Sequence, residues 1–208
     1  MTGVTVVDHP LVARHLSVLR DQSTPSGEFR QRMGEAAMLI GFEALRDLRL
    51  AQIEITTPME STQGARLADD IVVIAILRAG LGMVEGFLGL MPEARVGHLG
   101  MYRDEDKLSP VGYYESIPDH GPEAEIVLVD PMLATGGSAA SALRRLKERG
   151  ARRLRFVCLV AAPEGLDAVR AEHPDVPLFC AAIDRELDGR GYFRPGLGDA
   201  GDRLYGTD

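Results

Sequence analysis

The residues best suited to chemistry lie in a loop near the middle of the chain. Residues 125–129 are mostly apolar and β-branched, which predicts a buried strand, and Asp130 and Pro131 end it. Residues 135–138, TGGS, follow, and a helix-forming run covers 138–149. Backbone N–H groups of a glycine loop, hydroxyl groups and a helix N-terminus together bind phosphate. This stretch therefore predicts a phosphate cradle.

The carboxylate of Asp130 distinguishes this loop from a site for phosphate alone. A carboxylate accepts hydrogen bonds only, and vicinal sugar hydroxyls can donate them, so the pattern favours a ribose phosphate. A tight turn in which Asp130 merely caps the chain is the structural alternative. The loop is not a Walker A motif, because Ser138 stands where that motif has its lysine.

Two arginines follow other predicted strands. Arg78 begins RAGLGM directly after the apolar run 71–77, and Arg103 lies in MYRDE just past the run 95–100. A guanidinium can bind a diphosphate through two parallel hydrogen bonds. A solvated surface arginine is the alternative for each residue. Two arginines that face one cradle indicate a diphosphate site more strongly than either arginine alone.

The C-terminal run 191–207, GYFRPGLGDAGDRLYGT, has no helical or strand period, and its glycines predict a shaped loop. Residues 196–201 match the dinucleotide fingerprint GxGxxG. Too little chain follows for the helix and second strand of a βαβ unit, so we interpret the match as accidental. A glycine-rich loop can instead present backbone N–H and C=O groups to a flat polar ring such as a nucleobase.

The elements that must position these loops alternate between strands and helices. Strands are predicted at 4–8, 52–57, 71–77, 95–100, 125–129, 154–161 and 178–183, and helices at 9–20, 28–48, 83–90, 138–149 and 164–172. This alternation predicts an α/β fold, an open, mainly parallel twisted sheet with helices on both faces. Ligands of such sheets bind beyond the carboxyl ends of strands, where Arg78, Arg103 and Asp130 emerge.

We expect one domain over 1–208. Residues 1–60 would form an N-terminal helical appendage, 70–185 the core sheet and 186–208 a C-terminal loop. The terminal segments would make a small hood, and a flap or hairpin is expected near 101–116, around 107–110 (KLSP).

Composition narrows the function classes. The chain has 208 residues, 45% of them hydrophobic, and a formal charge of −8, which argues against broad nucleic-acid binding. It has neither an apolar run that could span a bilayer nor a signal-peptide pattern at its start, so we expect a cytoplasmic protein. Cys158 and Cys180 lie in apolar runs, which favours a buried structural role. The histidines lack metal-ligand spacing.

Several segments together resemble one known family. VLVDPMLATGGSA resembles the phosphoribosyl-diphosphate loop of the type I phosphoribosyltransferases, in the form of the uracil phosphoribosyltransferase branch. ILRAGLGM, MYRDE, RFVCLVAAPEG and the C-terminal run match that branch in order and spacing, and HPLVARHLSVLRD extends the likeness to the start of the chain.

The resemblance implies an enzyme that joins uracil to 5-phospho-α-D-ribose 1-diphosphate and yields UMP and diphosphate. It implies a catalytic set of Asp130, Arg78, Arg103 and Asp199. The implied donor-binding residues are Arg78, Arg103, Asp130, Pro131, Met132, Leu133, Ala134, Thr135, Gly136, Gly137, Ser138 and Asp199. The implied uracil-binding residues are Tyr192, Phe193, Gly198, Asp199 and Ala200.

The chain departs from the wider family at two positions. Many type I relatives have two adjacent acids where this chain and the uracil branch have Asp130-Pro131. The resemblance thus implies Mg²⁺ held mainly by the substrate diphosphate and water, without protein ligands. Phe193 replaces a usual isoleucine, and its backbone contact implies little change in base specificity.

The resemblance also implies a homodimer or higher homo-oligomer, with small-molecule substrates and neither nucleic acid nor membrane as partner. GTP activates part of the family, and no residue pattern here decides whether it is an effector. A nucleotide-sensing RNA-binding regulator shares the donor loop, although the acidic charge and the C-terminal run weigh against it. Transfer to another base, a purine or orotate, is the third alternative.

Overall fold

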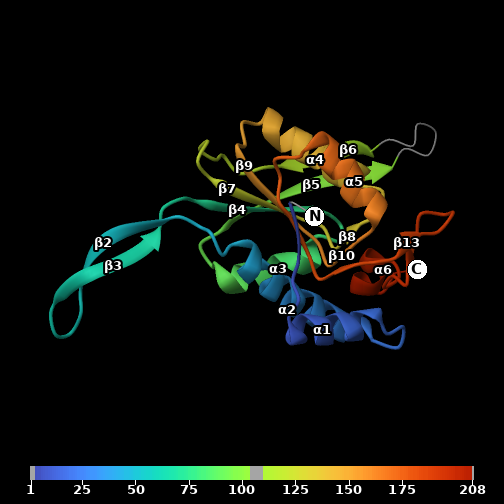
Figure 1. Ribbon diagram of the computed structural model, residues 1–208, viewed down its shortest axis with the longest axis horizontal. Helices are drawn as coiled ribbons and strands as arrows, with labels where there is room; N and C mark the ends of the chain where they lie inside the picture. The colour runs from blue at the N-terminus through green and yellow to red at the C-terminus, as the bar shows by residue number, and fades with distance from the viewer. Residues whose placement is uncertain (1–2, 104–109, 208) are drawn as a thin grey trace.

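Strands and helices alternate along most of the chain, and helices cover both faces of one central sheet (Figure 1). The structure, a computed structural model, describes residues 3–103 and 110–207. In chain order its elements are β1 (Val4–Val6), α1 (Pro10–Arg20), α2 (Ser26–Ala44), β2 (Leu50–Thr56), β3 (Ser61–Leu67), β4 (Ile71–Leu77), α3 (Leu81–Leu90), β5 (Arg95–Arg103), β6 (Pro110–Ser116), β7 (Glu125–Val129), β8 (Met132–Leu133), α4 (Gly137–Glu148), β9 (Arg153–Val157), β10 (Val160–Ala161), α5 (Pro163–Glu172), β11 (Leu178–Cys180), β12 (Ala182–Ile183), β13 (Glu186–Leu187), β14 (Phe193–Arg194) and α6 (Ala200–Tyr205).

The central sheet has seven strands in the order β1-β11-β9-β7-β4-β5-β6. All neighbours run parallel except β5 and β6, which are antiparallel. The predicted open, mainly parallel α/β sheet with helices on both faces is therefore confirmed. A short parallel sheet, β12-β10-β8, lies just beyond the carboxyl ends of β11, β9 and β7 in sequence.

The direction of winding reverses between β4 and β7. β4 leads through α3 to β5 on one side, and β7 leads through α4 to β9 on the other. Such a switch point opens a crevice at the carboxyl ends of the two strands, where ligands of doubly wound sheets bind. Arg78 follows β4 and Asp130 follows β7, so both residues lie at this crevice.

Alternate residues of the buried strands face two separate cores. In β7, Val127 and Val129 belong to the core with α1, α2 and α3. Ile126 and Leu128 face the opposite core with α4 and α5. Figure 1 shows these two groups of helices on opposite sides of the sheet.

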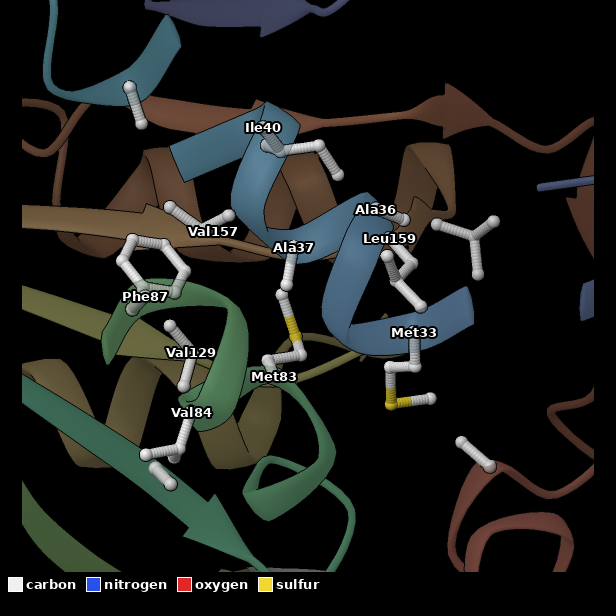
Figure 2. Close-up of a cluster of buried hydrophobic side chains, with 14 of the residues drawn as sticks. Met33, Ala36, Ala37, Ile40, Met83, Val84, Phe87, Val129, Val157 and Leu159 are labelled. Carbon is white, nitrogen blue, oxygen red and sulfur yellow. The ribbon is translucent and has the colours of Figure 1, made fainter. Parts of the chain in front are cut away.

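The helix α2 is buried along one face because its apolar residues recur at helical spacing. Its predicted span of 28–48 is too long, since the chain turns at Leu45, which caps the helix. Figure 2 shows the contact of α2 with α3 and the sheet, made by Met33, Ala36, Ala37, Ile40, Met83, Val84, Phe87, Val129, Val157 and Leu159.

Two parts of the N-terminal segment differ from a simple helical appendage. β1 pairs with β11 and forms an edge of the central sheet. β2 and β3 form a hairpin that extends away from the rest of the molecule (Figure 1). The strand β3 was not predicted, because its sequence STQGARL is polar and most of its residues are exposed.

The prediction that residues 191–207 lack regular structure is wrong in part. Phe193–Arg194 pairs with β13, and Ala200–Tyr205 is helical. The helix begins because the Asp199 carboxylate accepts a hydrogen bond from the Asp202 N–H at 2.9 Å. Burial of Leu204, 1% exposed, then holds it against the core. None of the helices in the described ranges has the length and hydropathy needed to cross a bilayer.

Candidate active site

The loop between β7 and α4 encloses a small cavity. Its volume is about 80 Å³, and its lining is made by Asp130 and residues 132–139. Gly136 precedes α4 with φ +81°, a left-handed conformation that glycine adopts without strain. The first N–H groups of a helix have no partner within it, so the start of α4 offers donors to an anion in this cavity.

The start of α5 supports this loop from behind. A Cβ on Gly165 would lie 2.4 Å from the Ala134 carbonyl oxygen and 2.7 Å from that of Leu133. A Cβ on Gly136 would lie 2.8 Å from the Gly165 carbonyl oxygen. Only glycine permits this approach of two backbones. Gly165 was not predicted as a site residue, and its only signal in the sequence is its place in the motif APEG.

Asp130 lies at the end of β7 and forms part of the cavity wall. Burial raises the pKa of its carboxyl group from 3.8 to about 7, and a hydrogen bond from the Met132 N–H opposes that shift. A cleft carboxyl group with a strongly shifted pKa is typical of functional sites. The residue is thus placed to accept hydrogen bonds from a sugar once it is ionised.

Arg78 lies beyond the end of β4, and its side chain is 57% exposed. Its Nη2 atom lies 3.3 Å from Asp202 Oδ1, and its guanidinium lies 5.7 Å from the Tyr205 ring centroid. A Cβ on Gly201 would lie 3.3 Å from Asp199 Oδ1 and 3.8 Å from Arg78 Nη2. The structure therefore brings Arg78 and Asp199 together, as the predicted site requires.

Arg103 ends β5, where its backbone pairs with Pro110. The position of its side chain lies outside the described part of the chain, as do residues 107–109 of the predicted flap. A place for Arg103 at the diphosphate thus stays a prediction. The antiparallel pair β5–β6 confirms the hairpin expected near 101–116.

A second, larger cavity adjoins the first. Its volume is about 590 Å³, and it is lined by Met132, Asp188, Gly189, Arg190, Tyr192, Phe193, Arg194, Pro195, Gly196, Leu197 and Gly198. Met132 lines both cavities, so the C-terminal segment lies beside the phosphate loop. Two segments far apart in sequence therefore line two adjoining cavities.

Three of the predicted base-binding residues, Tyr192, Phe193 and Gly198, line this second cavity, whereas Asp199 and Ala200 follow in the chain and are not part of its lining. Tyr192 is 60% exposed, whereas the Phe193 side chain is 6% exposed and packs in the core. Asp199 caps α6, and Ala200 is buried in its first turn. Among the described residues, neither the N–H nor the C=O of Gly198 has a hydrogen-bond partner. Gly198 can therefore pair with the edge of a planar ligand.

Asp188 is a further residue at this cavity that was not predicted from the sequence. Its carboxylate accepts hydrogen bonds from the N–H groups of Tyr192 and Arg190, each at 3.0 Å, and pairs with Arg194 Nη2 at 2.7 Å. These hydrogen bonds lower the pKa of Asp188, and the bond from the Tyr192 N–H has the largest effect. A charged carboxylate therefore shapes the turn between β13 and β14, which forms one wall of the larger cavity.

The described residues contain no group of three histidine, cysteine or acidic side chains that could hold a metal ion. Asp130 is the acidic residue in the wall of the phosphate-loop cavity. This donor set suits an ion carried on a substrate diphosphate, since Mg²⁺ readily keeps phosphate and water ligands.

Comparison with known proteins agrees with this geometry. The family model for uracil phosphoribosyltransferase matches residues 6–207. A uracil phosphoribosyltransferase from Salinibacter ruber is 55% identical over all of this chain and 99% of its own length. One from Clostridium tetani is 52% identical over the full length of both chains.

Solved structures show the same fold. The AQ2163 protein from Aquifex aeolicus has a TM-score of 0.92 at 36% identity, with 97% of each chain covered. An adenine phosphoribosyltransferase from Leishmania donovani, 14% identical, has a TM-score of 0.59 over 92% of this chain and 88% of its own, and so shares the fold alone. The chain therefore belongs to the uracil phosphoribosyltransferase family of pentosyltransferases.

Proposed function

We propose that the two adjoining cavities are the donor half and the base half of one active site. The chain joins uracil to 5-phospho-α-D-ribose 1-diphosphate, giving UMP and diphosphate, the pyrimidine salvage reaction of its family. The observation that carries the site assignment is Met132, which lines both cavities. Their shared wall is where the anomeric carbon must meet the base.

The donor half binds the phosphoribosyl group through residues 130–138. The N–H groups at the start of α4 and the Thr135 and Ser138 hydroxyls bind the 5-phosphate. Asp130 accepts hydrogen bonds from the ribose hydroxyls. Arg78, with Arg103 as a further expected contact, binds the diphosphate, because guanidinium groups match two phosphate oxygens at once. Asp199 lies beside Arg78 at the junction of the two halves.

The base half reads uracil through the backbone around Gly198, with Tyr192, Phe193, Asp199 and Ala200 around the ring. Uracil offers carbonyl and N–H groups along one edge, and the N–H and C=O of Gly198, which are unpaired within residues 3–103 and 110–207, can match them. Cytosine has an amino group where uracil has a carbonyl. A donor that faces this amino group loses its hydrogen bond, which costs about 1–3 kcal/mol.

In the reaction, the N1 atom of uracil attacks the anomeric carbon as the bond to diphosphate breaks. Nitrogen loses its proton to solvent, and the diphosphate takes the bonding electrons. Positive charge develops on the ribose ring, and Asp130 stabilises it electrostatically. Arg78 stabilises the negative charge that collects on the leaving group.

Magnesium belongs to this proposal as an ion carried by the donor diphosphate and water. When bound, it would neutralise charge on the leaving group. The residues that would lie nearest are Arg78 and Asp130, and neither needs to bind the ion directly.

The proposal includes a homodimer with small-molecule substrates, in the cytoplasm. The hairpin β2–β3 extends from the molecule with Leu50 66% exposed and Met59 91% exposed, which favours contact with a second copy (Figure 1). Light scattering of the purified protein tests the dimer. Addition of GTP to the assay tests whether this chain shares the activation found in part of its family.

Two substitutions test the two halves separately. Thr135→Val removes a hydroxyl from the donor half, and we expect a donor KM about 10-fold higher with an unchanged uracil KM. Gly198→Ala strains a residue with φ +79° and brings a Cβ to 3.1 Å from the Arg203 Cδ atom, so it should raise the uracil KM instead.

Gly150→Ala is the control for the backbone strain of Gly198→Ala. Gly150 has φ +90°, and a Cβ there would meet nothing within 4 Å, so it carries the same backbone strain outside the site. A Gly198→Ala enzyme that raises only the donor KM would overturn the assignment of the base half.

A further inference from the structure

The end of the helix α1 is bound to the loop that leads to Gly198. Asp184, 3% exposed, forms a two-pronged ion pair with Arg20, in which Arg20 Nη1 lies 3.0 Å from Asp184 Oδ2 and Nη2 pairs with Oδ1. The same Oδ2 atom accepts the Gly196 N–H at 2.9 Å. Arg20 Nη1 also donates to the Gly196 carbonyl at 2.7 Å. One ion pair thus binds both polar groups of the Gly196 backbone.

Arg203 binds the backbone of Leu197, the residue that follows Gly196. Its Nη1 atom donates to the Leu197 carbonyl at 2.8 Å and to the Leu19 carbonyl, and its Nη2 atom donates to the Asp21 carbonyl at 2.6 Å. The guanidinium lies 4.3 Å from the centroid of the Phe29 ring. Arg203 thereby joins the loop to the end of α1.

We call Arg20, Asp184 and Arg203 the loop clamp. They come from α1, from the residue after β12 and from α6, so three distant segments meet at residues 196–197. Gly198 is the next residue, and its N–H and C=O have no partner in the described part of the chain. The clamp residues bind the N–H and C=O of Gly196 and the carbonyl of Leu197. The N–H and C=O of Gly198 stay available to a ligand.

We propose that Arg20 and Asp184 are positioning residues for uracil, which act through the Gly196 backbone without touching substrate. This inference rests on the proposed base half of the site. None of the clamp residues lines the cavity of the phosphate loop. Their loss should therefore affect binding of the base and leave binding of the donor unchanged.

The physical reason is that the loop is ordered before uracil arrives. A loop held by two charged groups does not lose conformational freedom when the base binds. Without Arg20, the Gly196 carbonyl loses its donor, and Asp184 is left as a buried charge without its partner. The loop must then reorganise, and uracil binding has to restore the productive geometry.

The test compares Arg20→Gln and Asp184→Asn with Arg14→Gln, an exposed arginine on the same helix. We expect the uracil KM to rise about 10- to 100-fold in both clamp variants, the range for loss of a charged hydrogen bond. The donor KM and the kcat at saturating substrates should stay within about 2-fold of the wild-type values. Arg14→Gln should leave all three constants unchanged. Thermal melting of each variant reports whether it is folded.

Arg20→Lys provides a second measure, because it keeps the charge and loses the two-pronged geometry. We expect a uracil KM between those of the wild type and Arg20→Gln. If Arg20→Gln does not fold, Arg20→Lys carries the test alone, and it still predicts a higher uracil KM with an unchanged donor KM.

The results separate this inference from the proposed function. If Gly198→Ala raises the uracil KM and folded clamp variants do not, the clamp has no positioning role, although the base half stands. Equal increases in both KM values with a lower melting temperature would also overturn the inference, since they indicate a structural role only. If Gly198→Ala has no effect on uracil either, the base assignment itself fails.

Discussion

Arg78 Nη2 lies 3.3 Å from Asp202 Oδ1, although the two residues are 124 positions apart. Asp202 stands in the first turn of α6, the helix that follows the proposed base loop. Thr207 Oγ1 donates to the same carboxylate oxygen at 2.7 Å, which fixes its orientation. The helix that begins beside the base half therefore also holds an arginine of the donor half.

Asp202→Asn tests this connection. The pair is 57% and 34% exposed, so its loss should lower the free energy of unfolding by less than about 1 kcal/mol. Arg78 would lose its orientation, and we expect the donor KM to rise about 2- to 5-fold, which corresponds to the same energy. Steady-state kinetics with both substrates measures the donor KM and the uracil KM of the variant. Asp175→Asn removes a comparable exposed pair with Lys147 and should change neither KM.

The raised pKa of Asp130 predicts how activity depends on pH. Because burial raises this pKa to about 7, the carboxyl group in the free enzyme is protonated below that pH and ionised above it. Only the ionised form can favour positive charge on the ribose ring. The kcat/KM for the donor should therefore rise as pH increases through about 7.

Asp130→Asn should abolish this dependence and lower kcat by about 100-fold or more, the loss typical of a removed electrostatic contact. Initial rates of UMP formation between pH 5.5 and pH 9, in steps of about half a unit around the expected pKa, give both profiles. A variant with the wild-type rate and profile would remove Asp130 from the mechanism.

The same shift has a consequence for stability. Between its unfolded pKa of 3.8 and its folded pKa of about 7, Asp130 binds a proton in the native state and releases it on unfolding. This difference makes the wild type lose stability, relative to Asp130→Asn, as pH rises through that window. Chemical denaturation of both proteins at pH 4.5 and pH 7.5, values near the ends of the window, measures the change. A constant difference between the two proteins would contradict it.

Gly165→Ala should damage the donor half through packing alone. The added methyl group would lie 2.4 Å from the Ala134 carbonyl oxygen, so the phosphate loop or α5 must move. Overpacking of this kind costs about 1–3 kcal/mol. We expect a lower melting temperature and a donor KM at least about 10-fold higher, with the uracil KM less affected.

Gly27→Ala is the control for this substitution. Gly27 lies in the first turn of α2, and a Cβ there would meet nothing within 4 Å. Since alanine favours helix, stability should hold or rise slightly, and both KM values should stay at the wild-type level. A Gly165→Ala enzyme with the same kinetics would show that the close approach does not shape the phosphate loop.

The sequence predicted the parts of the site that follow apolar strands. β4 and β7 were located at their observed bounds because each is a continuous buried run, and Arg78 and Asp130 follow directly from them. The phosphate loop was predicted because its glycines lie between the buried strand β7 and a helix-forming run. A local sequence pattern was therefore sufficient to locate a site residue wherever that residue directly follows a buried strand.

Features that depend on distant contacts were missed. The helix α6 has no strong apolar period and forms because Asp199 caps it and Leu204 is buried against the core. The ion pair of Arg20 with Asp184 joins positions 164 apart, and no periodicity or spacing in the sequence relates the two residues. The exposed strand β3 has no buried face to give it a period of two. Such features become visible only after the chain is folded.

A buried ion network at the opposite end of β7 from Asp130 predicts an effect on stability alone. Glu125, 2% exposed, pairs with Arg155 Nε at 2.6 Å, and Arg155 Nη1 donates to the carbonyl of Ala44 and the carboxylate of Asp47, each at 2.5 Å. Arg153 Nη2 lies 2.8 Å from the other oxygen of Glu125. The network binds the end of α2 to the amino end of the central strands.

Arg155→Met should cost about 3–5 kcal/mol of unfolding free energy, because it leaves a buried carboxylate with only one cation and the Ala44 carbonyl without its donor. Arg46→Met is the matched control. Arg46 lies just past the end of α2, is 66% exposed and pairs with Glu43 in the last turn of that helix, so its loss should cost less than about 1 kcal/mol. Urea denaturation compares the two variants.

Both variants should keep the wild-type KM values at a temperature where they are folded, since neither residue lines the donor or the base cavity. If Arg155→Met costs no more than Arg46→Met, the buried network does not stabilise the junction of α2 and the sheet. If it changes the donor KM while folded, the amino end of β7 is coupled to Asp130 at its carboxyl end, and the sheet is less rigid than its packing indicates.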